Sequence, residues 1–320
     1  AYAEDTQIIL DQLQILQKDI KTLEKAVYSK GVKTTFDIDT YPFLEDHSID
    51  GVPYLPGVMA LELFAQCSSL LVPESFVAGF KEVSFGLPVK LIRPKQKVRV
   101  IATRNGNEVK CTMESDLINS EGEVFGKPKQ HHIATVRLSK TYESSKKSTI
   151  DLPEIGEIAH SSNFIYSRFF HGPRFQCHAG IIKGIRIGDD VGADGRILQR
   201  HQLPNNKQFK LESENVEIKL ESYPMIIEAA FQNAGMVTME QSDMQALPVG
   251  ITSSTLMRQP ETNANLLIRT VCREISDGIS VHDAIIVEDL PHKPIVMIIE
   301  GIQLKALAPL EETMRFDLER

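Results

Sequence analysis

Two apolar segments that lie far apart in the chain share one pattern of polar residues, and each follows a proline. The first covers residues 58–67 after Pro56, and the second covers residues 225–235 after Pro224. Their common pattern is E-x-x-x-Q, formed by Glu62 and Gln66 in the first segment and by Glu228 and Gln232 in the second. Proline is well placed just ahead of a helix or in its first turn. The repeat therefore predicts two similar halves, each built around one buried helix.

Most of the remaining pattern is typical of strands. β-Branched residues and alternation predict strands at residues 98–103, 108–114 and 132–138 in the first half, and at 264–271, 279–288 and 294–304 in the second. Asn105 and Gly106 form a hairpin turn signal between the first two strands. Each half is thus predicted to be one helix with a long antiparallel sheet, which makes the fold class α+β.

The N-terminal residues have a different pattern. Apolar residues within 4–28 follow the spacing of a coiled-coil seam, and Gly31 is a stop signal. This fits either a dimerising or linker helix, with a possible homodimer, or an amphipathic helix packed on its own domain. A polar, Ser-rich stretch at residues 140–147 indicates a linker. We therefore divide the chain into an N-terminal helix at 1–32, a first half at 33–147 and a second half at 148–320.

Charge and composition narrow the classes of function. The net charge of -8 argues against a nucleic-acid partner, since phosphate binding depends on clustered Lys and Arg. No apolar run reaches the roughly 18 residues of a membrane span, and charged residues interrupt the N-terminus where a signal peptide would be apolar. Four scattered cysteines without metal-type spacing favour reduced thiols and a cytoplasmic protein. The chain begins at Ala1 within a helical pattern, which suggests a domain of a longer polypeptide.

One histidine stands in a distinctive position just before the first apolar segment. His47, Gly51 and Pro56 read H-x3-G-x4-P. The ordinary pKa of histidine, near 6.5, lets it act as a base at neutral pH. Glu228 is the second candidate, because a carboxylate on an apolar helix is unusual without a function. The two residues would form an acid/base pair if the halves fold against each other.

Three motifs in order carry a resemblance to a known family. They are the histidine motif, the G-P-x-F-Q segment at residues 172–176, and Glu228-x3-Gln232 at the place of a D-x-x-x-Q/H motif. A Leu-Pro step at residues 247–248 adds to them. In these features the chain resembles the dehydratase domains of polyketide synthases and related multi-domain fatty acid synthases. The resemblance implies a double hot-dog fold, in which two sheets each wrap a central helix.

The resemblance also implies a reaction, a set of partners and site residues. The reaction is the syn elimination of water from a β-hydroxyacyl thioester in polyketide or polyunsaturated fatty acid synthesis. The partners are an acyl carrier protein and neighbouring synthase domains. The catalytic residues would be His47 as base and Glu228 as a protonated acid whose pKa burial raises. No metal or organic cofactor is expected, because the substrate arrives on the phosphopantetheine of the carrier protein.

Further site residues are expected around this pair. Backbone N–H groups at or near Gly51, or at the helix start after Pro56, are expected to donate hydrogen bonds to the enolate oxygen. Gln232 would orient Glu228, and Tyr166 and His171 would face the substrate. Two residues depart from the family: Glu228 replaces the usual Asp, as in stand-alone bacterial dehydratases, and His171 replaces a common Tyr.

A single active site is predicted for the chain, because no histidine precedes the second helix at the matching distance. Glu62 is then expected to be structural. Alternative functions share the fold. One alternative is a product-template-like aldol cyclase, which also pairs a histidine with an acid. Another is a catalytically inactive scaffold or docking domain, which the Asp-to-Glu change would allow. A hot-dog thioesterase is a third alternative.

Overall fold

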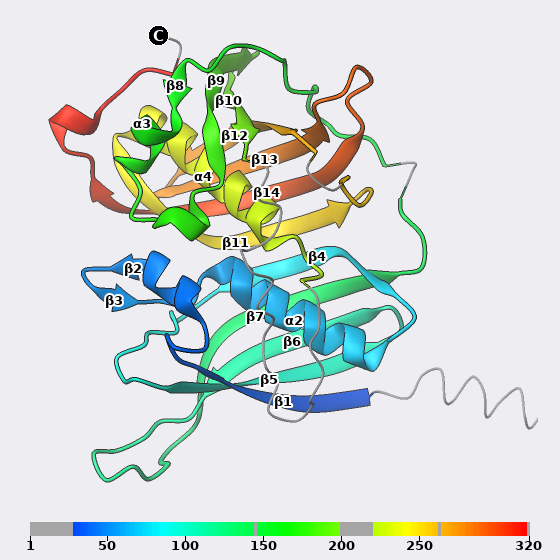
Figure 1. Ribbon diagram of the computed structural model, residues 1–320, viewed down its shortest axis with the longest axis vertical. Helices are drawn as coiled ribbons and strands as arrows, with labels where there is room; N and C mark the ends of the chain where they lie inside the picture. The colour runs from blue at the N-terminus through cyan, green and yellow to red at the C-terminus, as the bar shows by residue number, and fades with distance from the viewer. Residues whose placement is uncertain (1–27, 144–145, 199–219, 262–263, 319–320) are drawn as a thin grey trace, which may run out of the picture.

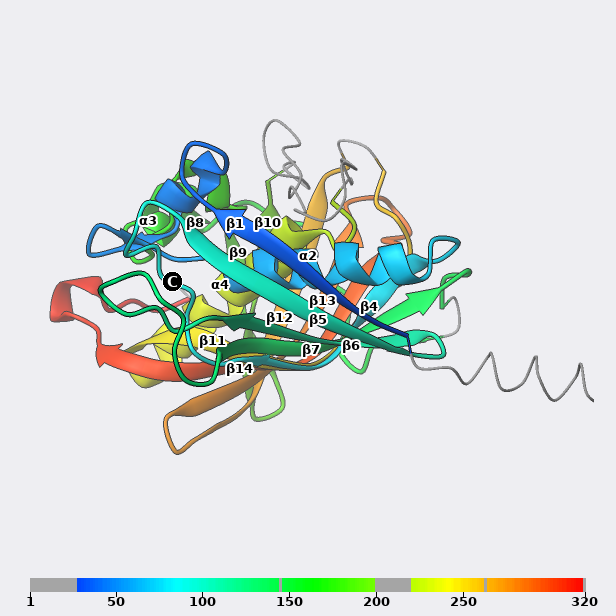
Figure 2. The same cartoon turned by 90° about the horizontal axis from the view of Figure 1, so that it is seen from below.

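Two halves, each with a sheet wrapped around one helix, lie one above the other along the long axis of the molecule (Figure 1). The computed structural model describes residues 28–143, 146–198, 220–261 and 264–318. The first half holds helix α2 (Gly57–Leu71), and the second holds helix α4 (Pro224–Ser242). Seen from below, strands of the first half lie across α2 (Figure 2). The helix expected in each half is thus present: α4 begins at Pro224, and α2 begins directly after Pro56.

The strands of the two halves join into one antiparallel sheet of 12 strands. In the first half the order is β1 (Tyr28–Phe36), β5 (Gln96–Asn105), β6 (Glu108–Ser115), β7 (Lys129–Ser139) and β4 (Phe76–Phe85). It continues into the second half as β11 (Met244–Leu256), β14 (Ile295–Pro309), β13 (Ile279–Glu288), β12 (Leu266–Ser276), β10 (Asp190–Ile197), β9 (His178–Ile187) and β8 (His160–Ser161). The short elements are η1 (Pro42–Asp46), β2 (Ser48–Ile49), β3 (Val52–Pro53), α3 (Ser162–Tyr166), η2 (Pro173–Phe175) and η3 (Glu312–Met314).

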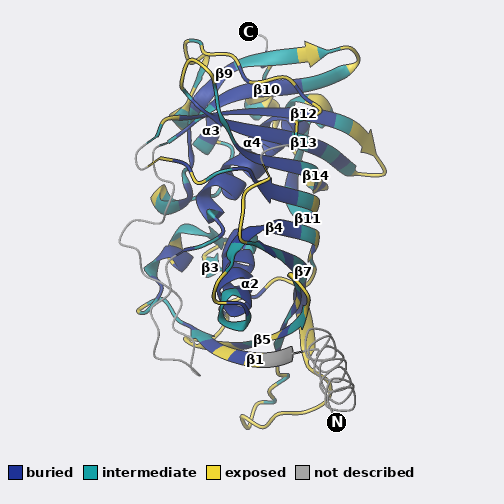
Figure 3. Cartoon of the chain, turned by 90° about the vertical axis from the view of Figure 1, so that its right-hand side faces the viewer, coloured by how far each residue is buried: buried dark blue, intermediate teal, exposed yellow. Residues whose placement is uncertain are grey.

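Both central helices are buried on every side over most of their length (Figure 3). In α4 every residue from Pro224 to Met239 is buried, and in α2 every residue from Val58 to Ser68. A helix that is apolar all round is stable only where it is enclosed, and the curved sheets supply that enclosure. The polar residues that remain on these helices, such as Glu228, must find partners inside the protein.

The halves meet where β4 pairs with β11, at Ser84 with Gly250, Val83 with Ile251 and Lys81 with Ser253. Gly79 lies at a register shift of β4 and has a φ of 144°. A Cβ atom at this position would stand 1.9 Å from the carbonyl oxygen of Ser254, so the close approach of the two strands requires glycine. This junction fixes how the two helices face each other.

The structure confirms the six predicted strands and corrects the N-terminal boundary. Strand β1 begins at Tyr28 and includes Gly31, so residues 28–32 belong to the first sheet instead of to the N-terminal helix. Pairing with β5 explains why this segment is extended. The rest of the helix predicted at residues 4–28 lies outside the described residues. All four cysteines are buried thiols. Among the helices of the described residues, none has the length and apolar character needed to span a membrane.

The internal repeat is visible in the hydrogen bonds of the two helices. Gln66 Nε2 donates to Glu62 Oε1 at 2.7 Å, and Gln232 Nε2 donates to Glu228 Oε1 at 2.9 Å. Glu62 also accepts bonds from the backbone N–H of Ser222 at 2.9 Å and from its hydroxyl at 2.6 Å. Glu62 therefore ties α2 to the segment that leads into α4, in agreement with the structural role predicted for it.

Replacing Glu62 with leucine is expected to lower the free energy of unfolding by about 3 kcal/mol, because buried donors of Ser222 and Gln66 lose their acceptor. Urea unfolding followed by circular dichroism would measure this loss. Glu74→Leu is the matched control, since the Glu74 side chain is 85% exposed and should change stability by less than about 1 kcal/mol. Equal stabilities of the Glu62 and Glu74 variants would contradict this account of Glu62.

Candidate active site

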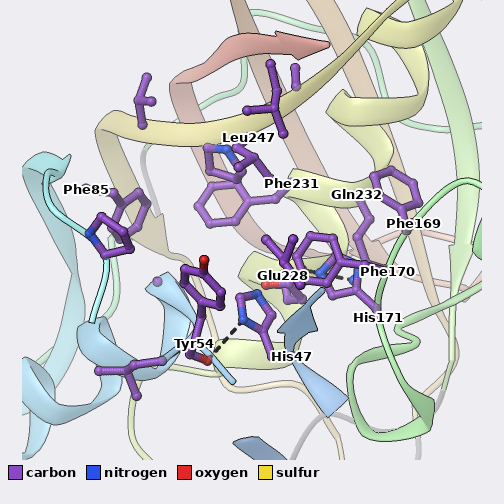
Figure 4. A pocket seen from close by; sticks show the side chains of 18 of the residues that line it. His47, Tyr54, Phe85, Phe169, Phe170, His171, Glu228, Phe231, Gln232 and Leu247 are labelled. Atoms are coloured by element: carbon purple, nitrogen blue, oxygen red, sulfur yellow. Dashed lines mark hydrogen bonds and ion pairs between the residues drawn. The ribbon is translucent and has the colours of Figure 1, made fainter. Parts of the chain in front are cut away.

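A cavity of about 440 Å³ lies between the two halves and takes its wall from both (Figure 4). The first half contributes part of the segment 47–57, residues of the loop after β4, and His132 of β7. The second half contributes residues 169–171, α4 and the first part of β11, including Leu247 and Pro248. Most of the lining is apolar. Lys90 and Leu307 also line the cavity and are exposed, so it opens to solvent on their side.

His47 follows η1 directly and its side chain reaches into this cavity. Its Nδ1 atom lies 3.1 Å from the carbonyl oxygen of Tyr54, and the Tyr54 N–H donates to the carbonyl oxygen of His47 at 2.9 Å. A carbonyl oxygen can only accept, so Nδ1 carries the ring proton in the neutral imidazole. Nε2 is then left with a lone pair, which is the form that a base requires.

The environment of His47 keeps its ring neutral. Burial and the neighbouring His171 lower its pKa, while Glu228 acts in the opposite direction, and the resulting pKa is about 4. The centres of the two imidazole rings are 5.5 Å apart. At neutral pH the imidazole of His47 is therefore uncharged and available to accept a proton.

Glu228 projects from α4 into the same cavity and is held by two partners. Gln232, one helical turn further on, donates to Oε1 at 2.9 Å, and His171 Nε2 lies 3.1 Å from the same oxygen. The side chains of His171 and Glu228 are only 8% and 7% exposed. Gln232 is itself fixed, because its amide also donates to the carbonyl oxygen of Phe175 at 2.7 Å. The carboxyl group is thus tightly positioned within the second half.

The structure does not support the protonated carboxyl group that was expected at Glu228. Burial raises the pKa of Glu228, as expected, but the hydrogen bond and charge of His171, with further contributions from His47 and Gln232, outweigh it and bring the pKa below its ordinary value. The sequence alone suggested a carboxyl kept protonated by burial. The structure instead pairs Glu228 with the imidazole of His171, and this partner favours the ionised carboxylate.

The loop that carries His171 is bound to the loop that carries His47. The Gly172 N–H donates to the carbonyl oxygen of Asp46 at 2.8 Å, and Arg174 forms an ion pair with the Asp46 carboxylate at 2.7 Å. A Cβ atom at position 172 would lie 2.4 Å from Asp46 Oδ1, which explains why the motif requires glycine. The G-P-x-F-Q segment therefore joins the two halves at the site.

Three residues predicted to contact substrate do not line the cavity. Gly51 is exposed in the β2–β3 turn, where its φ of 74° suits glycine. Pro56 is buried and forms the N-cap of α2. Tyr166 donates to Gln232 Oε1 at 2.7 Å and accepts from the His178 N–H at 2.7 Å. Tyr166 thereby supports Gln232, which lines the cavity together with His171.

Several lining residues were not predicted from the sequence. Phe170 stacks on His171 with ring centres 4.5 Å apart and lies edge-on to His47 at 5.0 Å. Phe169 also packs against His171, with ring centres 5.7 Å apart. The run of aromatic residues directly before the Gly-Pro step could have indicated that they line the cavity. Nothing in the spacing, however, indicated that His171 would contact Glu228.

Comparison with known proteins supports the fold. A family model for the polyketide synthase dehydratase domain matches residues 14–116, which is less than half of the chain. The dehydratase domain from the CurF module of curacin polyketide synthase has a TM-score of 0.62 at 16% identity, with 87% of this chain and 93% of that chain covered. A trans-AT polyketide synthase dehydratase domain from Brevibacillus brevis gives 0.64 at 18% identity, with 87% and 94% covered. The sequence matches none of the curated proteins.

A third solved structure is the dehydratase domain of PpsC from Mycobacterium tuberculosis in complex with C12:1-CoA. It has a TM-score of 0.61 at 15% identity, with 87% of this chain and 94% of that chain covered. These matches confirm the double hot-dog fold and the resemblance to polyketide synthase dehydratase domains that the motifs predicted. At such low identity the likeness establishes the fold, and the roles of single residues rest on the geometry of the site itself.

Proposed function

We propose that this chain is a dehydratase that removes water from a β-hydroxyacyl thioester carried by an acyl carrier protein, giving the 2-enoyl thioester. One observation carries the proposal: His47 of the first half and the Glu228–His171 pair of the second half line the same apolar cavity. Elimination of water needs a base for a weakly acidic proton and an acid for a poor leaving group, and this arrangement offers both.

The reaction follows from the proton positions. His47 Nε2 removes a proton from the α-carbon of the substrate, and the electrons of that C–H bond form the α,β double bond. The bond from the β-carbon to its hydroxyl oxygen breaks, and the Glu228–His171 pair supplies the proton with which that oxygen leaves as water. Both hydrogen bonds from Gln232 and His171 reach Oε1 of Glu228, so we assign Oε2 to the leaving hydroxyl.

The three groups share one proton before and after turnover. His47 holds the proton taken from the substrate, and the pair recovers it once water has left. The short distance of 5.5 Å between the rings of His47 and His171 favours this return. The developing enolate oxygen needs a donor, and the N–H groups at the start of α2 serve this role, because Gly57 lines the cavity.

The substrate enters on the phosphopantetheine arm of the carrier protein, and no other cofactor is required by this chemistry. The exposed side of the cavity near Lys90 and Leu307 is the entry that we assign to the arm. The apolar lining suits an acyl chain of polyketide or fatty-acid type. Neighbouring synthase domains in the cytoplasm would supply the hydroxyacyl group and consume the enoyl product.

Hydration of an enoyl thioester tests the proposal, because the reaction is reversible. The protein is incubated with crotonyl-pantetheine and longer 2-enoyl homologues, and the 3-hydroxy product is followed by mass spectrometry. Formation of that product supports a dehydratase. No hydration with any chain length, including substrate on a carrier protein, contradicts it. Ring closure of a poly-β-ketone thioester by the same protein would identify a cyclase instead.

The low pKa of His47 predicts an unusual pH profile for this reaction. Activity requires His47 to be neutral when the Glu228–His171 pair holds its proton, so rate is lost as pH falls through the pKa of His47, about 4. We expect no loss of kcat/KM as the pH falls from 7 to about 5, because this whole range lies above the pKa of His47. Each rate is accepted only where the circular dichroism spectrum is unchanged. An acid limb with its midpoint near 6.5 would show that His47 is not shielded as described.

A further inference from the structure

We propose that His132 forms a separate binding subsite, which recognises an uncharged hydroxyl, carbonyl or amide group of the thioester substrate at a distance from the reacting carbons. The inference rests on the proposed function for the kind of ligand. The position of the subsite comes from the structure, in which His132 lines the cavity and is 4% exposed. Neither of its ring nitrogens has a hydrogen-bond partner among the described residues.

This lack of partners distinguishes His132 from the other buried histidines of the described chain. His131 bonds Ser115 at 2.7 Å and a backbone carbonyl at 2.9 Å. His178 bonds the carbonyl oxygen of Ala229 at 2.9 Å, and His282 bonds the Thr238 hydroxyl at 2.8 Å. Buried polar groups are rarely left unbonded, because each costs free energy. A ligand group that completes the bonds of His132 explains why an imidazole is found there.

His132 reaches the cavity from β7, whereas His47 follows η1 and Glu228 lies on α4. It is paired with Phe85 across β7 and β4, and the two rings meet edge-on at 5.7 Å. Phe85 in turn contacts Phe231 at 5.9 Å, and Phe231 follows Glu228 by nearly one turn of α4. In the view of Figure 4, Phe231 is drawn between Phe85 and Glu228. Phe85 and Phe231 thus form a chain of ring contacts from His132 to the helix that carries Glu228.

The chemistry of the subsite is that of a neutral imidazole. Burial, together with the neighbouring His131, lowers the pKa of His132 to about 4, so it carries one donor and one acceptor at neutral pH. This pair matches a hydroxyl, a carbonyl or an amide better than an ion. Such a group could belong to the acyl chain or to the pantetheine arm, which contains amides.

Binding of inert ligands tests the subsite independently of catalysis. The probes are saturated acyl-pantetheine thioesters with and without one hydroxyl beyond the β-carbon, at successive positions, and the ethyl thioesters of the same acids, which lack the pantetheine amides. Calorimetry compares wild type with His132→Phe, which keeps the aromatic contact with Phe85. We expect about a tenfold loss of affinity for ligands that reach the imidazole, the value of one hydrogen bond.

The pattern of loss identifies the source of the group. A loss confined to certain hydroxylated acyl chains places it on the acyl chain, and a loss for all pantetheine ligands but no ethyl thioester places it on the arm. His132→Gln, which retains a donor and an acceptor, should keep part of the affinity. His160→Phe is the matched control, because His160 stacks on Phe164 and does not line the cavity.

Equal affinities of wild type and His132→Phe for every ligand, or no binding by either, would overturn the subsite. The hydration assay keeps this outcome separate from the main proposal. If the wild-type protein hydrates enoyl thioesters but His132→Phe has no effect on binding, only the subsite proposal is contradicted. If the protein binds the ligands through His132 but hydrates no enoyl thioester, the dehydratase proposal is contradicted and the subsite proposal stands.

Discussion

His47→Gln lowers kcat/KM for hydration of a 2-enoyl thioester by about 10²- to 10⁴-fold in this account, the usual contribution of a general acid or base. The amide of glutamine can replace the hydrogen bond of Nδ1 to the Tyr54 carbonyl oxygen but cannot exchange a proton at the position of Nε2. The fold should be unaffected, because the His47 side chain faces the cavity instead of the core. Steady-state hydration rates and thermal unfolding of the same preparation measure both effects.

The control for this variant is another histidine outside the cavity. His160 stacks on Phe164 in the second half, and His160→Gln should leave the hydration rate within about twofold, since it removes no group of the site. If His47→Gln retains a rate similar to that of His160→Gln, His47 is not the base. The site assignment would then fail even if the wild-type protein is a dehydratase.

Glu228→Gln is the second large effect that we expect, again about 10²- to 10⁴-fold in kcat/KM. The substitution keeps the shape of the side chain and removes the carboxylate that shares a proton with His171 at 3.1 Å. Thermal stability should change little, because the glutamine oxygen can still accept the hydrogen bonds that Gln232 and His171 offer to Oε1. Glu228→Asp should lose less activity, since it keeps an acid but withdraws it from His171 and Gln232.

The internal repeat provides a control for this prediction inside the same molecule. Glu62→Gln changes the equivalent residue of α2, whose carboxylate accepts bonds from Ser222 and does not line the cavity that holds His47 and Glu228. We expect Glu62→Gln to lower the unfolding midpoint and to leave the rate per folded molecule unchanged. Loss of activity without loss of stability in the Glu62 variant, or the opposite pattern in the Glu228 variant, would contradict the division of roles between the two helices.

The elements with a regular sequence pattern were predictable. The E-x-x-x-Q repeat located both central helices, and alternation located β5, β6 and β7 and the last three strands. Strands β9 and β10 were missed because glycines such as Gly184 and Gly192 interrupt their pattern. At these positions a Cβ atom would stand 2.9 Å and 2.2 Å from backbone atoms of Leu318 and Thr270, so close packing determines the residue.

The site was predictable in its members but not in its electrostatics. The motifs identified His47, Glu228, His171 and Gln232, which line one cavity. The sequence could not place His171 beside Glu228, because that contact depends on the Gly172 and Arg174 bonds to Asp46 in the other half. Without this neighbour, burial alone set the expected pKa of Glu228, and the direction was wrong. Long-range contacts of this kind have no signature in local spacing.

The most direct test of the central claim is the hydration rate of the double variant His47→Gln, Glu228→Gln beside those of the two single variants. If the two residues act in one site and in one chemical step, each single variant loses most of the catalysis, and the double variant falls little further. Effects that multiply in the double variant would instead show that the residues act independently. A wild-type rate in either single variant would likewise contradict a site shared between the halves.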